Sequence, residues 1–285
     1  MKTLIKKNFY KLTLERFPGA YRPNSLPYIS GDTFRKFSNH IFDETRSFNP
    51  KKVKNNEIIF LNSELIEIFF SIHDPKIKSK YILISHNSDK SPSKEELNLI
   101  SENVIHWFVQ NLEINNNSRI SFLPIGLENK RWLKNGIFRN TTDSDFKPKL
   151  VLSSFNVYNN YSVRKMVLDI ANTNKNIENK KFSNSKKYFK ELKQYKFILC
   201  PPGNGPDTHR IWESLMYKTF PIFELNSFTN NLKNLGVPAL YLNSWSDLGS
   251  ISDKDLKLEY KKLSNLNSDM IYFDFWDNQF KSKLL

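Results

Sequence analysis

Short apolar runs alternate along the chain with segments in which apolar residues recur at helical spacing. In the first half these runs predict strands at Leu26–Ser30, Glu57–Leu61, Tyr81–Ser85 and Ile120–Leu123. The intervening patterns predict helices at Thr33–Glu44, at Glu64–Ile72 after an Asn62-Ser63 cap, and after Ser93, where Glu96 completes a capping box. Strands that alternate with helices are typical of an α/β fold.

The same alternation restarts after a polar segment, Arg139–Lys149, which we interpret as a linker. The second half predicts strands at Leu150–Ser154, Lys196–Cys200, Phe220–Phe223 and Ala239–Leu242, and helices at Ser162–Asn172 and Asp207–Lys218. The sequence therefore predicts two Rossmann-like domains, residues 1–143 and 144–285, that face each other across a cleft. The aromatic tail, Met270–Phe280, is a candidate to pack back on the first domain.

Net charge raises the question of an anionic partner, since the 285 residues carry a formal charge of +14. A basic surface can bind nucleic acid or anionic lipid. However, the lysines are interleaved with Asn, Ser and acidic residues, and the densest basic run, Glu178–Lys196, reads as an exposed helix with its flanking loop. No basic-aromatic motif or recognition-helix pattern is present, so we expect no specific nucleic acid partner.

The single cysteine, Cys200, excludes an intramolecular disulfide and fits a reducing compartment. No run of about 18 apolar residues occurs, and the basic N-terminal segment lacks the apolar core of a signal peptide. We therefore expect no membrane span and a cytoplasmic protein, of a bacterium or of a virus-infected host cell. The sequence leaves the oligomeric state open.

The most informative stretch runs from Phe197 to Ile222, FILCPPGNGPDTHRIWESLMYKTFPI. A buried strand leads into a loop with Gly203 and Gly205, where the backbone can approach a ligand closely. Asp207 or Thr208 can then cap a helix, whose free N–H groups suit a diphosphate.

Two charged residues on that helix, Arg210 and Glu213, are three positions apart and share a face. A guanidinium suits phosphate oxygens, and a carboxylate can accept hydrogen bonds from ribose hydroxyls. His209, at the first turn, can reach either phosphate or sugar, or can simply be solvated. The pair alone could equally be an ordinary surface ion pair, but its combination with the loop and the cap is uncommon.

The segment CPPGNGPDTHRIWESLMYKTFPI resembles the donor-binding signature of exostosin-like glycosyltransferases, above all the short soluble versions of bacteria and large DNA viruses. Five further segments resemble the same group: Ser30–Arg35, Ser85–Asp89, Trp107–Asn111, Pro124–Asn129 and Ser153–Arg164, the last of which resembles the entry loop of the donor domain. The chain departs from the family pattern at Pro202, where many relatives have Arg, and at Lys218-Thr219, where Leu-Gly is usual.

This resemblance implies a GT-B architecture and an inverting, metal-independent transfer of a xylose- or hexose-type sugar. The expected donor is a nucleoside-diphosphate sugar with UDP as its nucleotide. The acceptor would be a glycan hydroxyl, and no other cofactor would be required. The implied donor residues are Ser153, Ser154, Asn156, Arg164, Gly203, Asn204, Gly205, Asp207, Thr208, His209, Arg210 and Glu213. Arg164 would complete a phosphate clamp, or is a solvated helix residue.

An inverting transfer needs a base that removes the proton of the acceptor hydroxyl. Asp32 and Asp89 follow two predicted strands of the first domain and are equal candidates, although either could be a cap or turn residue. Glu128 and His86 are weaker candidates and are counted with Arg35 as acceptor-binding residues; Arg35 could instead pair with Asp32. A non-catalytic relative that binds a glycan or nucleotide is the alternative function.

No metal site is predicted, because the five histidines are scattered and none has ligand spacing with carboxylates. The Asp-x-Asp motif of metal-dependent sugar transferases is also missing.

Overall fold

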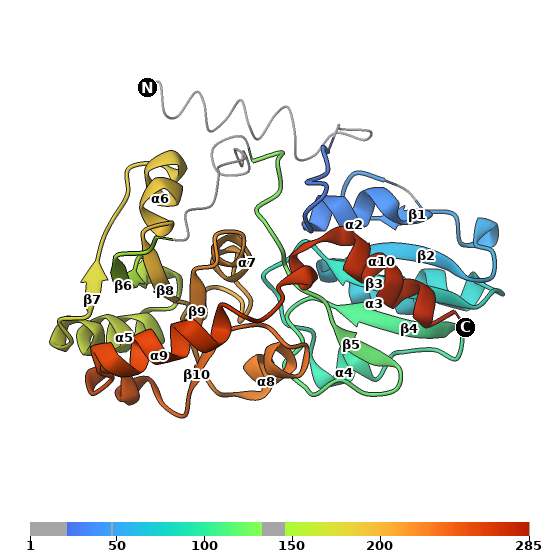
Figure 1. Ribbon diagram of the computed structural model, residues 1–285. Helices are drawn as coiled ribbons and strands as arrows, with labels where there is room; N and C mark the ends of the chain where they lie inside the picture. The colour runs from blue at the N-terminus through green and yellow to red at the C-terminus, as the bar shows by residue number, and fades with distance from the viewer. Residues whose placement is uncertain (1–21, 47, 133–145, 285) are drawn as a thin grey trace, which may run out of the picture. The chain divides into compact units, whose positions relative to one another are not determined.

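The computed structural model describes residues 22–46, 48–132 and 146–284 (Figure 1). These residues form two compact units. Unit 1 contains residues 22–46, 48–112, 116–132 and 272–284, and unit 2 contains residues 113–115 and 146–271. The predicted boundary after residue 143 and most of the predicted linker lie outside the described residues.

Unit 1 is built on a parallel sheet of five strands in the order β1-β2-β3-β4-β5. The strands are β1 (His40–Phe42), β2 (Glu57–Asn62), β3 (Tyr81–His86), β4 (Val104–Val109) and β5 (Ile120–Phe122). All six residues of β3 are buried, as expected for a central parallel strand with a continuous apolar run. The predicted strands at 57–61, 81–85 and 120–123 are confirmed.

The start of unit 1 differs from the prediction. Residues 26–30 form no strand and make only isolated bridges, Tyr28 with Tyr272 and Ser30 with Gly126. Pro27 has no N–H to give to a ladder, and Ser30 already caps the next helix, α2 (Gly31–Phe37), through its hydroxyl. The predicted helix 33–44 is wrong beyond Phe37, because the next residues pair with β2 as the edge strand β1.

The other helices of unit 1 are short. The predicted helix at 64–72 is broken into η2 (Ser63–Leu65), α3 (Ile66–Ile68), η3 (Phe69–His73) and η4 (Asp74–Lys76), and η1 spans Pro50–Lys52. Asn62 caps the first of these turns as predicted. Helix α4 (Lys94–Leu97) begins with the predicted capping box, in which Ser93 and Glu96 exchange hydrogen bonds.

The C-terminal helix α10 (Phe273–Ser282) belongs to unit 1. Its aromatic stripe meets Phe34 of α2, with ring centroids 6.2 Å apart for Phe273 and 6.0 Å for Phe280. Phe280 also packs edge-on against Phe108 of β4, at 4.8 Å. The aromatic tail therefore covers one face of the sheet beside α2 (Figure 1).

Unit 2 is also built on a parallel sheet of five strands, in the order β10-β9-β8-β6-β7. Its strands are β6 (Lys149–Ser153), β7 (Ile177–Asn179), β8 (Tyr195–Leu199), β9 (Phe220–Glu224) and β10 (Leu240–Leu242). The first strand lies between the second and the third, so the direction of winding reverses between β6 and β8. In such sheets ligands bind outside the carboxyl ends of the strands at that reversal.

The helices of unit 2 are α5 (Tyr161–Thr173), α6 (Ser185–Leu192), α7 (His209–Leu215), α8 (Ser227–Asn234) and α9 (Asp253–Leu263), with η5 (Val157–Asn159), η6 (Trp245–Gly249) and η7 (Asp269–Ile271). Helix α7 is shorter than the predicted 207–218. It ends before Lys218, whose φ of 49° is left-handed, and glycine would be favoured there.

Together the two units confirm the predicted α/β class with two parallel-sheet units. Their arrangement about a cleft stays a prediction.

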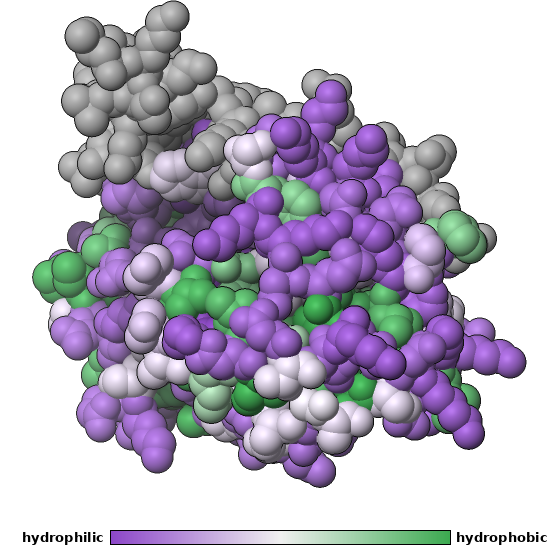
Figure 2. All heavy atoms as spheres, turned by 90° about the vertical axis from the view of Figure 1, so that its left-hand side faces the viewer, coloured by the Kyte–Doolittle hydropathy of each residue, from purple (hydrophilic) through white to green (hydrophobic). Residues whose placement is uncertain are grey.

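The basic run 178–196 is only partly the exposed helix that the sequence predicts. It contains α6, but it begins within β7 and ends within β8. Its lysines are also partly neutralised: Lys180 lies 3.3 Å from Glu178 and 2.9 Å from Glu191. The face of the molecule in Figure 2 is mainly hydrophilic, with hydrophobic residues in scattered patches. None of the helices in the described ranges is long and apolar enough to cross a bilayer.

Candidate functional site

The loops that carry the predicted donor residues leave two neighbouring strands of unit 2. Ser153 is the last residue of β6, and Ser154 and Asn156 follow it. The loop 200–208, with Gly203, Asn204 and Gly205, follows β8, which pairs directly with β6. Both loops therefore leave the carboxyl edge of the sheet at the winding reversal, where a ligand is expected.

Arg164 of α5 ties these two loops together. Its Nε donates to the carbonyl oxygen of Pro202 at 2.8 Å, and its Nη1 donates to that of Asn156 at 2.7 Å. Its Nη2 lies 3.4 Å from the carbonyl oxygen of Pro201. The residue is buried, so it is not the solvated helix arginine of the alternative reading. Because all three guanidinium nitrogens bind loop carbonyls, Arg164 acts as a positioning residue for the site.

Gly203 leaves room for the Arg164 guanidinium in this packing. A Cβ atom at this position would lie 2.8 Å from Arg164 Nη2, closer than Cβ atoms approach other groups. The loop also folds on itself, since Gly203 N–H donates to the carbonyl oxygen of Gly205 at 2.9 Å. The glycine-rich loop is therefore shaped by its contact with Arg164.

The residues before α7 have roles that the capping prediction does not capture. Thr208 occupies the N-cap position, but its side chain makes no capping hydrogen bond. The Asp207 carboxylate instead accepts a hydrogen bond from the buried Trp212 indole N–H, at 2.9 Å. Asp207 thus satisfies the one polar group of a large core side chain.

Replacing Asp207 by alanine is expected to lower the free energy of unfolding by about 1–3 kcal/mol, because the buried Trp212 N–H would lose its acceptor. Asp207→Asn keeps an acceptor oxygen at the same place and is expected to cost less. Chemical denaturation of both variants measures the difference. Equal stability of the alanine variant and the wild type would contradict this role.

The charged residues of α7 lie beside this loop. Glu213 is buried, whereas Arg210 and His209 are half-buried, and His209 begins the helix as predicted. Burial, followed by the charge of Arg210, lowers the pKa of Arg164 to about 10. Burial also raises the pKa of the Cys200 thiol to about 12, although Arg210 and Arg164 oppose that shift. These electrostatic effects indicate that the guanidinium groups of Arg164 and Arg210 and the Glu213 carboxylate lie close together.

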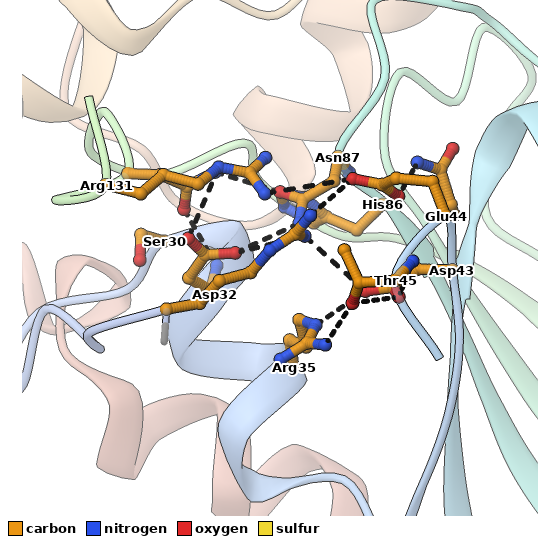
Figure 3. Close-up of polar contacts among 12 residues, drawn as sticks. Ser30, Asp32, Arg35, Asp43, Glu44, Thr45, His86, Asn87 and Arg131 are labelled. Atoms are coloured by element: carbon orange, nitrogen blue, oxygen red, sulfur yellow. Dashed lines mark hydrogen bonds and ion pairs between the residues drawn. The ribbon is translucent and has the colours of Figure 1, made fainter. Parts of the chain in front are cut away.

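Unit 1 carries a second polar cluster, centred on Asp32 in the first turn of α2 (Figure 3). The Asp32 side chain is fully buried. Its Oδ1 lies 3.3 Å from Asn87 Nδ2 and 3.9 Å from Arg22 Nη1, and its Oδ2 lies 3.5 Å from Arg131 Nε. Ser30 caps the helix, so the alternative of Asp32 as the N-cap is wrong.

Electrostatics distinguish Asp32 from the other acids of the cluster. Burial raises the pKa of the Asp32 carboxyl, and the charges of Arg131, Arg22 and Arg35 offset that effect only in part. Its Oδ2 accepts no hydrogen bond from any described residue, which leaves lone pairs on a buried carboxylate. A carboxyl with a raised pKa and a spare acceptor oxygen is suited to take up a proton.

Arg35 does not bind Asp32 directly. Its Nε donates to Asp43 Oδ2 at 2.6 Å, and its Nη2 donates to Thr45 Oγ1 at 3.0 Å. Of the two predicted alternatives for Arg35, pairing with Asp32 is therefore wrong in this detail, since the partner is Asp43. Asp43 also approaches Arg22, at 3.4 Å, so Asp43 links Arg35 to the cluster around Asp32.

His86 is buried at the end of β3 and is held on both ring nitrogens. Its Nε2 lies 3.0 Å from the carbonyl oxygen of Pro124, and its Nδ1 accepts from the Asn87 N–H at 2.7 Å. This pairing fixes the neutral tautomer with the proton on Nε2. Such a histidine is better suited to shaping the site than to accepting a proton.

The remaining candidates of unit 1 are more open. Asp89 is exposed after β3, and Glu128 is half-buried after the Gly126 turn. Two tryptophans of this unit also differ in burial, because Trp107 is fully buried and donates to Ser85, whereas Trp132 is 37% exposed beside Arg131. Core packing therefore explains Trp107.

Several residues of the Asp32 cluster have no role in the sequence analysis. Asn87 and Asn129 stand inside segments that resemble the family, and Asn129 Oδ1 accepts from the Asp32 N–H at 2.8 Å. The position of these two polar residues at the ends of predicted strands is the sequence signal that could have indicated a role in the site. Arg22, Asp43 and Arg131 carry no such signal, since they come from distant parts of the chain.

Metal ligands do not gather in either unit: within the described ranges no group of three or more His, Cys, Asp or Glu could hold an ion.

The family comparison concerns the part of the chain that holds the glycine loop and α7. Residues 153–285 match the family model described as the RXYLT1 C-terminal domain. The match covers slightly less than half of the chain, and it shows similarity of this segment to that family. The match to the RXYLT1 C-terminal domain confirms the exostosin-like resemblance over the strand ends, loop and helix described above.

Two solved structures with glycosyltransferase titles are weakly similar to the chain. The glycotransferase of kitacinnamycin is 10% identical, with a TM-score of 0.37, over 80% of this chain and 71% of its own. The spinosyn rhamnosyltransferase SpnG is 8% identical, with a TM-score of 0.38, over 80% and 68%. Because these TM-scores are low, the fold is assigned from the strand orders of the two sheets and not from these two structures. No curated protein matches the chain significantly.

Proposed function

We propose that this chain is an inverting, metal-independent glycosyltransferase that moves a xylose- or hexose-type sugar from a UDP-linked donor to a glycan hydroxyl. The observation that carries the proposal is the pair of loops at the winding reversal of unit 2, tied together by Arg164 and followed by Arg210 and Glu213. The match of this segment to the RXYLT1 C-terminal domain supports the same assignment.

In this proposal unit 2 binds the donor. Arg210 neutralises the diphosphate, because a guanidinium forms strong, charge-assisted hydrogen bonds with phosphate oxygens. Glu213 accepts hydrogen bonds from the ribose hydroxyls, as acids do in other nucleotide sites. Pro202, where many relatives have Arg, leaves Arg210 as the cation of the loop region that can contact phosphate, since Arg164 is engaged with carbonyls.

Unit 1 supplies the base. Asp32 is favoured over Asp89 because its pKa is raised and its Oδ2 has acceptor capacity to spare. As the sugar carbon is attacked, the acceptor hydroxyl gives its proton to this carboxylate, the new glycosidic bond forms, and the bond to the UDP leaving group breaks. Arg22 and Arg131 hold the carboxylate in place.

Binding of UDP tests the donor half of the proposal. Arg210→Ala and Glu213→Ala are each expected to weaken UDP binding about tenfold or more, because each removes a hydrogen bond that involves a charged group. Isothermal titration calorimetry measures the change, and Lys218→Ala, an exposed residue after α7, is the matched control. Wild-type affinity in both variants would show that the site is elsewhere.

A further inference from the structure

Tyr188 lies near the start of α6, the helix that follows β7. The charge pattern of the sequence predicts a solvated basic helix here and indicates no role for Tyr188. The ring is instead packed between two phenylalanines, with centroids 5.8 Å from Phe182 and 5.0 Å from Phe189.

The Tyr188 hydroxyl is fully buried, and its polar contact with Arg210 lies outside normal hydrogen-bond geometry. Its neighbours are the site residues of unit 2. Burial, followed by the charge of Glu213, raises its pKa well above the usual tyrosine value, and Arg210 opposes that shift. The hydroxyl thus keeps its proton and lies close to the two residues that are proposed to bind the donor.

Two more buried polar atoms of this region lack partners among the described residues. They are Thr208 Oγ1, at the N-cap of α7, and Arg210 Nε. Buried side-chain polar groups nearly always have a partner, because each one left unsatisfied costs about 1–3 kcal/mol. Three such atoms from α6 and the start of α7, beside one glycine loop, are typical of a site whose remaining partner is a ligand.

We propose that the Tyr188 hydroxyl binds the nucleoside diphosphate of the donor, donating a hydrogen bond to a phosphate oxygen next to Arg210. Phosphate oxygens accept from hydroxyl groups as well as from guanidinium groups. An O–H donor beside Arg210 would replace part of the phosphate contact that an arginine at position 202 would make, since proline has no side-chain donor. This inference rests on the proposed function of unit 2.

The variant Tyr188→Phe removes only the hydroxyl and keeps the ring between Phe182 and Phe189. We expect it to bind UDP about tenfold more weakly in calorimetry. We also expect its free energy of unfolding without nucleotide to be unchanged or higher, because an unsatisfied buried group is lost. Tyr158→Phe is the matched control, since Tyr158 is 84% exposed, and its UDP affinity should equal that of the wild type.

Different results separate this inference from the function on which it rests. Wild-type UDP affinity in Tyr188→Phe, together with weakened binding in Arg210→Ala, would overturn the role of Tyr188 and leave the donor site intact. Lower stability of the nucleotide-free Tyr188→Phe variant would also overturn it, because the hydroxyl would then have a partner within the protein. If the wild type bound neither UDP nor GDP, the proposed function itself would fail.

Discussion

Replacing Asp32 by asparagine is expected to reduce the rate of sugar transfer by about 10²- to 10⁴-fold, the usual contribution of a general base. Asparagine preserves the shape of the side chain and keeps one acceptor oxygen, so it retains only one of the contacts with Asn87 and Arg131, and it cannot accept the proton. UDP affinity should stay at the wild-type value, since Asp32 belongs to unit 1 and the donor residues belong to unit 2. Initial rates of transfer and a UDP titration of the same preparation measure both quantities.

The pH dependence of the wild type provides an independent readout. A general base works when it is ionised, so activity is lost as the pH falls through its pKa. Burial raises the pKa of Asp32, and we therefore expect the acidic limb of the rate profile to lie above the ordinary aspartate value of 3.8. A limb at or below that value would argue against Asp32.

Asp89→Asn is the matched control for the base, because it makes the same chemical change at an exposed position after β3. Loss of transfer in this variant, with full activity in Asp32→Asn, would assign the base to Asp89. Full activity in both variants would exclude both candidates. A wild-type protein that binds UDP but neither hydrolyses nor transfers any sugar would match the non-catalytic alternative.

The second large effect is expected at Arg164. Arg164→Ala should lower the free energy of unfolding by roughly 3 kcal/mol or more, because carbonyl oxygens of Asn156, Pro201 and Pro202 would lose their donor. It should also weaken UDP binding, since the loops after β6 and β8 would no longer be tied together. Denaturation curves and calorimetry measure the two effects.

Two variants sharpen the interpretation. Arg164→Lys keeps the charge but cannot reach three carbonyls with a planar fork, so we expect it to restore little of the stability. Lys165→Ala alters the next residue of α5, whose ion pair with Asp169 is exposed, and should cost less than about 1 kcal/mol. A stable Arg164→Ala protein with normal UDP affinity would contradict the positioning role.

The parts of the fold that the sequence predicts well are those with strong local signals. The apolar run of β3, the capping box at Ser93 and the strand-loop-helix from Phe197 are each specified by neighbouring residues. The donor-site candidates come from the same kind of local pattern. These candidates lie close together because they follow β6 and β8, which are adjacent in the sheet. The alternation of strands and helices along the sequence is the signal for such a parallel sheet.

The features that the sequence misses depend on distant partners. Residues 40–42 look helical by spacing but become β1 because β2 offers a sheet edge. Arg22 and Arg131 approach Asp32 from positions 10 and 99 residues away, and Arg164 is engaged by carbonyls that no side-chain pattern reveals. Tyr188 lies in a lysine-rich run, where charge patterning predicts the exposed face of a helix but not the contacts that the other side chains make.

The position of α10 has a consequence for the order in which the protein matures during synthesis. Unit 1 is interrupted by unit 2, and residues 272–284 return to cover Phe34 and Phe108. Domains generally fold as their residues leave the ribosome. The second unit, complete at residue 271, can therefore fold first, while the first keeps an apolar sheet face uncovered until the final helix emerges. Premature termination near residue 270 would release a chain with a finished unit 2 and an aggregation-prone unit 1.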